Sequence, residues 1–212
     1  MSKTKSIFNL VIVDASGSMK SKIEEVQGGL NQLFKELKED EKAVASVKNK
    51  ITVVDFSSHG DFNVLYNKAK PSKLKKLKDG DYVPRSMTAL YDAIGKAFSQ
   101  VPKSQDGVLV TIFTDGLEND SKEFKAADIK SLIEAKEALG WTITFMGTTQ
   151  ESMMHAQSIG IKRDRMMSYE NSKKGTSYAF NKVSSARRKY QHAVLREETV
   201  DDIFDEGNVT TT

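Results

Sequence analysis

The chain has 212 residues, of which 38% are hydrophobic and 29% charged, and this composition is that of one mid-sized folded domain rather than of a disordered segment. It contains no cysteine, so disulfides, thiolate metal sites, iron–sulfur clusters and cysteine nucleophiles are excluded. Three scattered histidines argue against an all-histidine metal site, and any bound metal is therefore expected to be a hard ion with oxygen ligands.

The first part of the chain predicts a strand followed by a helix. An apolar run at residues 7–13 leads directly into a polar loop at residues 14–18. Such a short run, bounded by turn residues, is typical of a strand buried on both faces. Apolar residues then recur at three- and four-residue spacing over residues 23–37, which predicts a helix with one apolar stripe.

Two further strands are predicted at residues 51–56 and 62–66. The connection between them, residues 57–61, is short and polar. So short a connection permits only an antiparallel hairpin, because a parallel crossover needs a dozen or more residues. The third strand is therefore expected at an antiparallel edge of the sheet.

The remaining chain alternates between strands and helices. Strands are predicted at residues 108–113, 141–146 and 166–169, and helices at residues 88–101, 124–139, 151–159 and 176–193. Thr88 is expected to cap the first of these helices with its hydroxyl group. In the second, Ile129, Leu132, Ile133 and Leu139 are expected to face inward.

These elements predict an α/β protein with a three-layer, doubly wound, Rossmann-like fold. Its sheet is expected to be mostly parallel and six-stranded, with one antiparallel edge strand and helices on both faces. If the strand order is 3-2-1-4-5-6, the first and fourth strands are neighbours, and their carboxyl ends flank the point where ligands bind in such sheets. Residues 1–193 are expected to form this single domain.

Residues 194–212 are expected to form an acidic, flexible tail. Over residues 193–212 there are one basic and six acidic side chains, so the rest of the chain carries +8, against +3 for the whole. The tail is open to three interpretations: a disordered solubilising segment, a docking peptide for a partner, or an internal ligand whose carboxylate binds the metal.

Oxygen donors follow the first and fourth predicted strands. The Asp-x-Ser-x-Ser spacing presents alternate side chains to one point, and Gly17 is expected to let the chain turn sharply. Hydroxyl and carboxylate oxygens, with water, suit Mg²⁺ or Mn²⁺. The predicted metal ligands are five oxygen donors on three loops: Asp14, Ser16, Ser18, Thr88 and Asp115.

Three motifs carry a resemblance to a known family: the loop at 14–18, the threonine that opens a helix at 88–95, and Thr-Asp-Gly at 114–116. Together they resemble the metal-ion-dependent adhesion site of von Willebrand factor type A (VWA) domains, over roughly residues 6–192, most closely the short stand-alone bacterial and phage members. One position departs from the family pattern, because Met87 stands where a glycine usually precedes the threonine. If that position needs a positive φ, the loop must adopt another shape.

The resemblance also implies roles for these residues. It implies that Ser16, Ser18 and Thr88 coordinate the ion directly, while Asp14 and Asp115 act directly or through water. It further implies that an Asp or Glu of a protein partner completes the coordination, so that the domain binds and is not an enzyme.

Two other functions use different features of the sequence. A Mg²⁺-dependent enzyme of phosphoryl transfer or hydrolysis could use an aspartate at a strand end as the acceptor, but the chain lacks a phosphate-binding Gly-x-x-x-x-Gly-Lys loop and a Ser-His-Asp grouping. A nucleic-acid-binding accessory protein could use the lysines of residues 68–78, but no aromatic platform accompanies them, so a solvated face is favoured.

The expected location is cytoplasmic, without a membrane interaction. The apolar run at residues 7–13 is too short for a signal core, and no apolar stretch approaches the length that spans a membrane.

Overall fold

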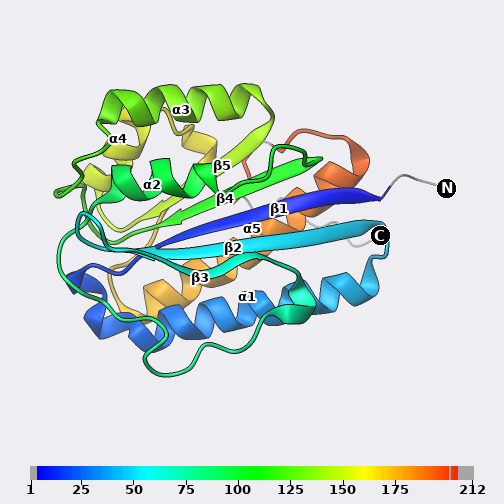
Figure 1. Ribbon diagram of the computed structural model, residues 1–212, viewed down its shortest axis with the longest axis horizontal. Helices are drawn as coiled ribbons and strands as arrows, with labels where there is room; N and C mark the ends of the chain where they lie inside the picture. The colour runs from blue at the N-terminus through cyan, green and yellow to red at the C-terminus, as the bar shows by residue number, and fades with distance from the viewer. Residues whose placement is uncertain (1–3, 201, 205–212) are drawn as a thin grey trace.

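The computed structural model describes residues 4–200 and 202–204 and has three layers, a six-stranded sheet between two groups of helices (Figure 1). The strand order is β3-β2-β1-β4-β5-β6, which confirms the predicted order. The strands are β1 (Lys5–Asp14), β2 (Val47–Phe56), β3 (Phe62–Ala69), β4 (Gly107–Phe113), β5 (Trp141–Gly147) and β6 (Met166–Ser168). Only β3 runs antiparallel to its neighbour, as expected for an edge strand.

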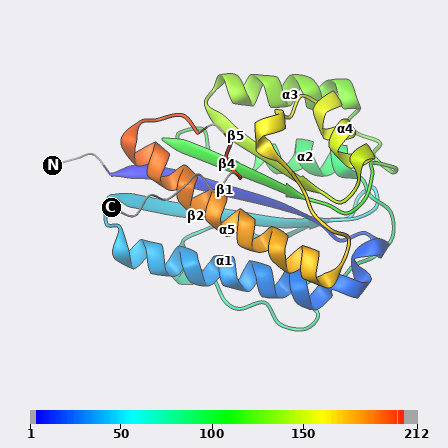
Figure 2. The same ribbon diagram turned by 180° about the vertical axis from the view of Figure 1, so that it is seen from behind.

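Helices cover both faces of the sheet. In Figure 1, α2, α3 and α4 lie above the sheet, α1 lies below it and α5 runs behind it; Figure 2, seen from behind, shows α1 and α5 side by side. The helices are α1 (Ile23–Ala43), α2 (Leu90–Ser99), α3 (Ala126–Ala138), α4 (Gln150–Ser158) and α5 (Lys173–Arg196). The fold is therefore the predicted doubly wound α/β fold.

The central strand β1 separates two hydrophobic cores. Phe8, Leu10 and Ile12 pack into the core shared with α2, α3 and α4, while Val11 and Val13 pack into the core shared with α1 and α5. Successive side chains of a strand point to opposite faces, so a strand between two helical layers needs apolar residues at nearly every position. This is the physical reason for the nearly continuous apolar run at the start of the chain, which only Asn9 interrupts.

The parallel pairing of β1 with β4 places two polar loops side by side. Val13 is in register with Phe113, so Asp14 and Thr114 leave the sheet at the same edge. On one side of β1 lies β2, the next strand in the chain. On its other side lies β4, which the chain reaches only after β3 and α2. The strand order therefore reverses beside β1, and ligands bind at such a point in doubly wound sheets.

Two sequence expectations about helices were wrong. Thr88 does not cap α2, which begins at Leu90 with Ala89 at the cap position and no side-chain cap hydrogen bond. Leu139 is the residue after the end of α3 and is 71% exposed, because the chain leaves the helix at this position. The inward positions Ile129 and Ile133 are fully buried.

The end of the chain packs beyond the expected domain boundary. Helix α5 continues to Arg196, and Val200 and Ile203 are buried against Ile7 and Val47, at the amino ends of their strands. This end of the sheet is opposite the edge where Asp14 lies. The part of the predicted tail at residues 205–212 lies outside the described residues, and its role stays a prediction.

Across residues 4–200 and 202–204, none of the helices is both long and apolar enough to cross a membrane.

Candidate metal site

Asp14, the last residue of β1, ties the loops of this edge together. Its side chain is fully buried, and Oδ1 accepts a hydrogen bond from the backbone N–H of Ser16 at 2.6 Å. Its Oδ2 accepts one from the hydroxyl of Thr114 at 2.6 Å, and its backbone carbonyl accepts one from the Tyr82 hydroxyl at 2.5 Å. Asp14 is thus held in one orientation by the end of β4 and by its own loop.

Ser16, Ser18 and Asp115 form a chain of oxygen atoms beside Asp14. The hydroxyl oxygens of Ser16 and Ser18 lie 3.0 Å apart, and the Ser18 hydroxyl donates to Asp115 Oδ1 at 2.5 Å. Ser16 and Asp115 are buried, whereas Ser18 is exposed. The group therefore opens to solvent at Ser18.

A second loop is joined to the loop at residues 14–18 by backbone hydrogen bonds. The N–H of Arg85 donates to the carbonyl of Ala15 at 2.7 Å, and the N–H of Gly17 donates to the carbonyl of Ser86 at 2.8 Å. A Cβ at Gly17 would lie 3.4 Å from that carbonyl oxygen. Gly17 has no positive φ, and 3.4 Å is an ordinary van der Waals contact, so neither the sharp turn expected from the sequence nor crowding requires a glycine here.

Thr88 is positioned by Asn119 instead of by a helix cap. Its backbone N–H donates to Asn119 Oδ1 at 2.8 Å, and its carbonyl accepts from the Asn119 N–H at 2.9 Å. A Cβ at Gly116 would lie 3.3 Å from Thr88 Oγ1 and 3.8 Å from Asp14 Oδ2, so these two oxygens border the same small space. The loop reaches this position without a positive φ at Met87.

The five predicted side chains are therefore brought together, from three loops, at the carboxyl ends of β1 and β4. The sequence did not single out Asn119 as a positioning residue, because its two backbone contacts with Thr88 span 31 residues. All the donors are hydroxyl or carboxylate oxygens, and two buried carboxylates supply negative charge. Such a set fits a hard divalent ion like Mg²⁺ or Mn²⁺.

Burial makes the ionised form of the Asp14 carboxyl group unfavourable. Burial raises its pKa from 3.8 to about 6, against the opposing effect of the hydrogen bonds from Thr114 and Ser16, and the nearby charge of Asp115 adds to the rise. A carboxylate whose pKa is raised by burial and by a like charge gains from any cation that binds beside it.

Lys22 is an unexpected member of the group. It is the last residue of the short 3-10 helix η1 (Gly17–Lys22), and only 3% of it is exposed. Its ammonium group forms an ion pair and hydrogen bond with Asp115 Oδ2. No sequence pattern indicated this contact, because a lysine among polar residues is usually solvated.

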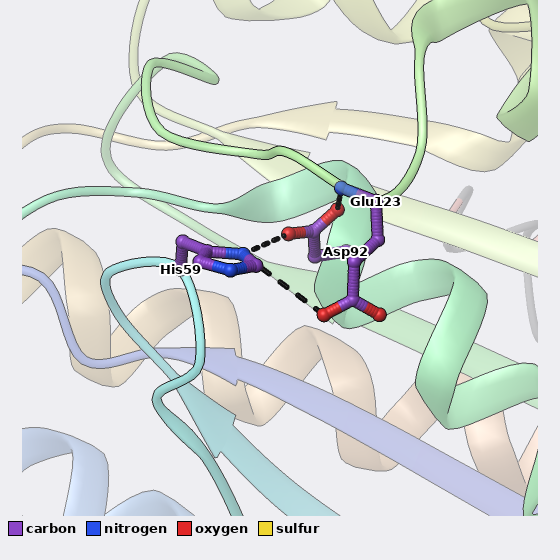
Figure 3. Close-up of side chains that lie close together, drawn as sticks. All are labelled: His59, Asp92 and Glu123. Carbon is purple, nitrogen blue, oxygen red and sulfur yellow. Dashed lines mark hydrogen bonds and ion pairs between the residues drawn. The ribbon is translucent and has the colours of Figure 1, made fainter.

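A separate group of metal-capable side chains lies on the β2–β3 loop, on α2 and on the loop between β4 and α3 (Figure 3). His59 Nδ1 lies 2.9 Å from Asp92 Oδ2 and 3.9 Å from Glu123 Oε1. A histidine with two carboxylates is a candidate for a divalent metal. This group was not among the sequence predictions.

The acceptor oxygens of this second group are already engaged within the protein. Asp92 accepts backbone N–H groups of Lys122, Glu123 and Phe124 at 2.9–3.0 Å, and Glu123 pairs with Lys96 at 2.6 Å. Burial by itself would raise the pKa of Asp92, but the hydrogen bonds from the backbone N–H groups of residues 122–124 and from His59 together hold that pKa below its ordinary value. Asp92 therefore clamps the loop that carries Asn119.

The His59→Gln variant separates the two groups by experiment. Because the two groups share no ligand, Mn²⁺ affinity is expected to stay within about twofold of the wild type. Isothermal titration with Mn²⁺ measures this affinity. Loss of Mn²⁺ binding in His59→Gln would instead assign the ion to His59, Asp92 and Glu123.

Fold and site together define a class: a doubly wound α/β domain whose strand-order reversal carries clustered hydroxyl and carboxylate oxygens. The family model for the von Willebrand factor type A domain matches residues 10–193, and the chain belongs to this family. Among curated protein sequences, none matches the chain.

Solved structures with the same fold come from varied proteins. The vWF domain of the type V pili tip protein Mfa5 from Porphyromonas gingivalis is 11% identical, with a TM-score of 0.68 over 94% of this chain and 99% of that one. The pilus adhesin SpaC from Lactobacillus rhamnosus GG is 11% identical, with a TM-score of 0.66 over 93% of this chain. Proximal thread matrix protein 1 from the mussel byssus is 17% identical, with a TM-score of 0.57 over 85% of this chain.

These similarities concern the fold alone, since the identities are low. This chain spans 45% of the mussel protein and 31% of the Lactobacillus adhesin. Family membership adds that VWA domains often mediate protein–protein interactions and often bind a divalent metal.

Proposed function

We propose that the domain binds one divalent cation, Mg²⁺ or Mn²⁺, and uses it to bind a carboxylate of a protein partner. The observation that carries the proposal is the convergence of five oxygen donors at the strand-order reversal. The hydroxyl groups of Ser16, Ser18 and Thr88 would hold the ion, with Asp14 and Asp115 supplying negative charge directly or through water.

The exposed side of the site suits an incoming partner. Ser18 is exposed while Ser16 and Asp14 are buried, so a ligand can approach the ion only from one side. A bound divalent ion supplies positive charge at that opening, and an Asp or Glu of a partner is the chemical group that would be attracted to it.

Binding is favoured over phosphoryl transfer. An aspartate that accepts a phosphoryl group needs an accessible oxygen, but the side chain of Asp115 is fully buried and paired with Ser18 and Lys22. Asp14 is equally buried, and each of its carboxylate oxygens accepts a hydrogen bond. We therefore propose that the domain is not an enzyme.

The wider context stays a prediction from the sequence resemblance. The pilus adhesin and pili tip protein among the similar structures accord with an interaction role, and they do not identify a partner for this chain. The bacterial or phage type, the cytoplasmic location and the absence of nucleic-acid binding are likewise predictions.

The Thr88→Val variant tests the predicted ligand set. Valine keeps the shape of threonine and removes only the hydroxyl group, so Mn²⁺ affinity is expected to fall by about tenfold or more while the protein stays folded. Thr144→Val is the matched control, because Thr144 is also buried but lies on β5, where its hydroxyl donates to the Val110 carbonyl at 2.8 Å. Isothermal titration with Mn²⁺, and circular dichroism in EDTA, measure the two properties.

The same variants test whether a protein partner binds through the metal ion. Affinity capture from the native host with Mg²⁺, with EDTA and with Thr88→Val should retain a given protein only with Mg²⁺ and an intact site, and Thr144→Val should behave as the wild type. Proteins retained equally under all conditions would overturn the metal bridge.

A further inference from the structure

Lys22 is a buried cation inside the proposed metal site. Its side chain is 4% exposed, and the Asp115 side chain that it contacts is fully buried. A lysine is rarely buried to this extent unless it is paired, because removing its charge from water is costly. The contact with Asp115 Oδ2 is therefore what holds the ammonium group at this position.

Both carboxylate oxygens of Asp115 are engaged within the protein. Oδ1 accepts the Ser18 hydroxyl at 2.5 Å, and Oδ2 accepts the Lys22 ammonium. Ser18 and Asp115 are also two of the five residues expected to hold the divalent ion. The ammonium group and the ion thus compete for one carboxylate, and two positive charges this close repel each other.

We infer that Lys22 is a tethered cation that neutralises Asp115 when no divalent ion is bound and must release it when the ion enters. This inference rests on the proposed function. It assigns Lys22 a regulatory role: the lysine weakens divalent-ion affinity and stabilises the metal-free domain.

The charge balance indicates a second consequence. Asp14, Asp115 and Lys22 together carry one net negative charge, and a divalent ion changes this to one net positive charge. One carboxylate of a partner then brings the site to neutrality. Lys22 therefore favours the metal-plus-carboxylate complex over the metal complex alone, which couples the two binding events.

Lys22 and the predicted ligand Ser18 lie on the same short segment of the chain. Lys22 ends η1, which starts at Gly17, so the same short helix carries Ser18 and the lysine. Met19, within η1, is fully buried and anchors it. Release of Asp115 by Lys22 thus occurs on the segment that carries a predicted ligand.

The test compares Lys22→Met with Lys20→Met. The Lys22 variant is expected to bind Mn²⁺ about tenfold or more tightly than the wild type, because a like charge beside the ion is removed even though the protein screens it with an effective dielectric constant of about 20. In EDTA the same variant is expected to unfold at lower urea, since Asp115 loses its partner. Lys20 lies on the same short helix and is exposed, so Lys20→Met is expected to match the wild type in both measurements.

A spectroscopic measurement complements the affinities. With ¹⁵N-labelled lysine, the Lys22 Nζ signal should be visible in EDTA, because burial slows exchange of its protons, and should shift or broaden as Mg²⁺ is added. Lys22→Gln, which keeps a polar side chain, replaces Lys22→Met in the titration if the methionine variant does not fold.

The outcomes separate the inference from the proposed function. Unchanged or weaker Mn²⁺ binding by both Lys22 variants, with normal binding by the wild type, overturns the inference and leaves the proposed function intact. A Lys22 Nζ signal that neither shifts nor broadens at saturating Mg²⁺ also overturns the inference. Mn²⁺ binding by neither the wild type nor any variant overturns the proposed function and the inference together.

Discussion

The Asp14→Asn variant is expected to bind Mn²⁺ about 100-fold more weakly than the wild type, which corresponds to about 2.7 kcal/mol of binding free energy. In EDTA, the same variant is expected to be more stable than the wild type. Asparagine keeps the shape of aspartate and removes the charge that the ion needs. Opposite changes in affinity and stability are expected where a residue is kept for binding at the expense of the folded state.

The stability change follows from the raised pKa of Asp14. Its folded-state value of about 6 lies above the ordinary 3.8, so the folded state holds the proton more tightly than the unfolded state. The resulting stabilisation is present below pH 4 and is lost as the pH rises through 6. At pH 7 the ionised carboxylate costs about 3 kcal/mol, at about 1.4 kcal/mol per pKa unit, and this cost is what the asparagine variant avoids.

Urea denaturation in EDTA at pH 5 and pH 7 measures this dependence, and Asp55→Asn is the control. Asp55 is also buried, but it pairs with Arg85 at 2.7 Å and accepts a hydrogen bond from Asn63 at 3.1 Å. Its variant is expected to lose stability, because Arg85 loses its charged partner, and to keep Mn²⁺ affinity within about threefold, because Asp55 is not a predicted ligand and the hydrogen bond from Arg85 to Ala15 uses only backbone atoms. An Asp14→Asn variant with wild-type Mn²⁺ affinity would contradict the proposed site.

The Gly29→Ala variant is expected to destabilise the domain by about 3 kcal/mol, through overpacking between α1 and α5. A Cβ at Gly29 would lie 2.1 Å from Phe180 Cγ, with the Phe180 Cβ also at 2.6 Å, so the ring cannot simply rotate away and α5 must move. Urea denaturation in EDTA measures the loss.

Gly28→Ala is the matched control for this variant. Gly28 is the preceding residue of the same helix, and a Cβ there would have no neighbour within 4 Å. Alanine in a helix interior is more favourable than glycine by about 0.8–1 kcal/mol, so this variant is expected to be more stable than the wild type. Equal effects of the two substitutions would mean that helix propensity, and not the contact with Phe180, determines the outcome.

The fold was predictable because its main elements have strong local patterns. The run at residues 7–13 is apolar except for Asn9, since β1 is covered on both faces, and the short connection at residues 57–61 forces a hairpin. The clustering of Asp14 and Asp115 followed from the strand order alone. That these residues bind a metal stays a prediction.

Helix ends and individual contacts were less predictable. Thr88 has the residue type of a helix cap and precedes an apolar stripe. Its backbone N–H is instead hydrogen-bonded to Asn119, and α2 begins only at Leu90. Leu139 follows Leu132 by seven residues, which is about two helical turns, but α3 ends at Ala138 and Leu139 is 71% exposed. In both cases a contact or chain exit decided by tertiary packing overrides the local preference.

The sequence by itself determined the layer order and the all-oxygen chemistry of the site, because both depend on residue types at fixed short spacings. Only the tertiary structure decided which charged groups are buried together. Lys22 and Asp115 are 93 residues apart, and their pairing depends on η1 packing over the end of β4. Burial and electrostatic interaction depend on distance in space, so only the folded chain shows that a buried lysine lies within the predicted site.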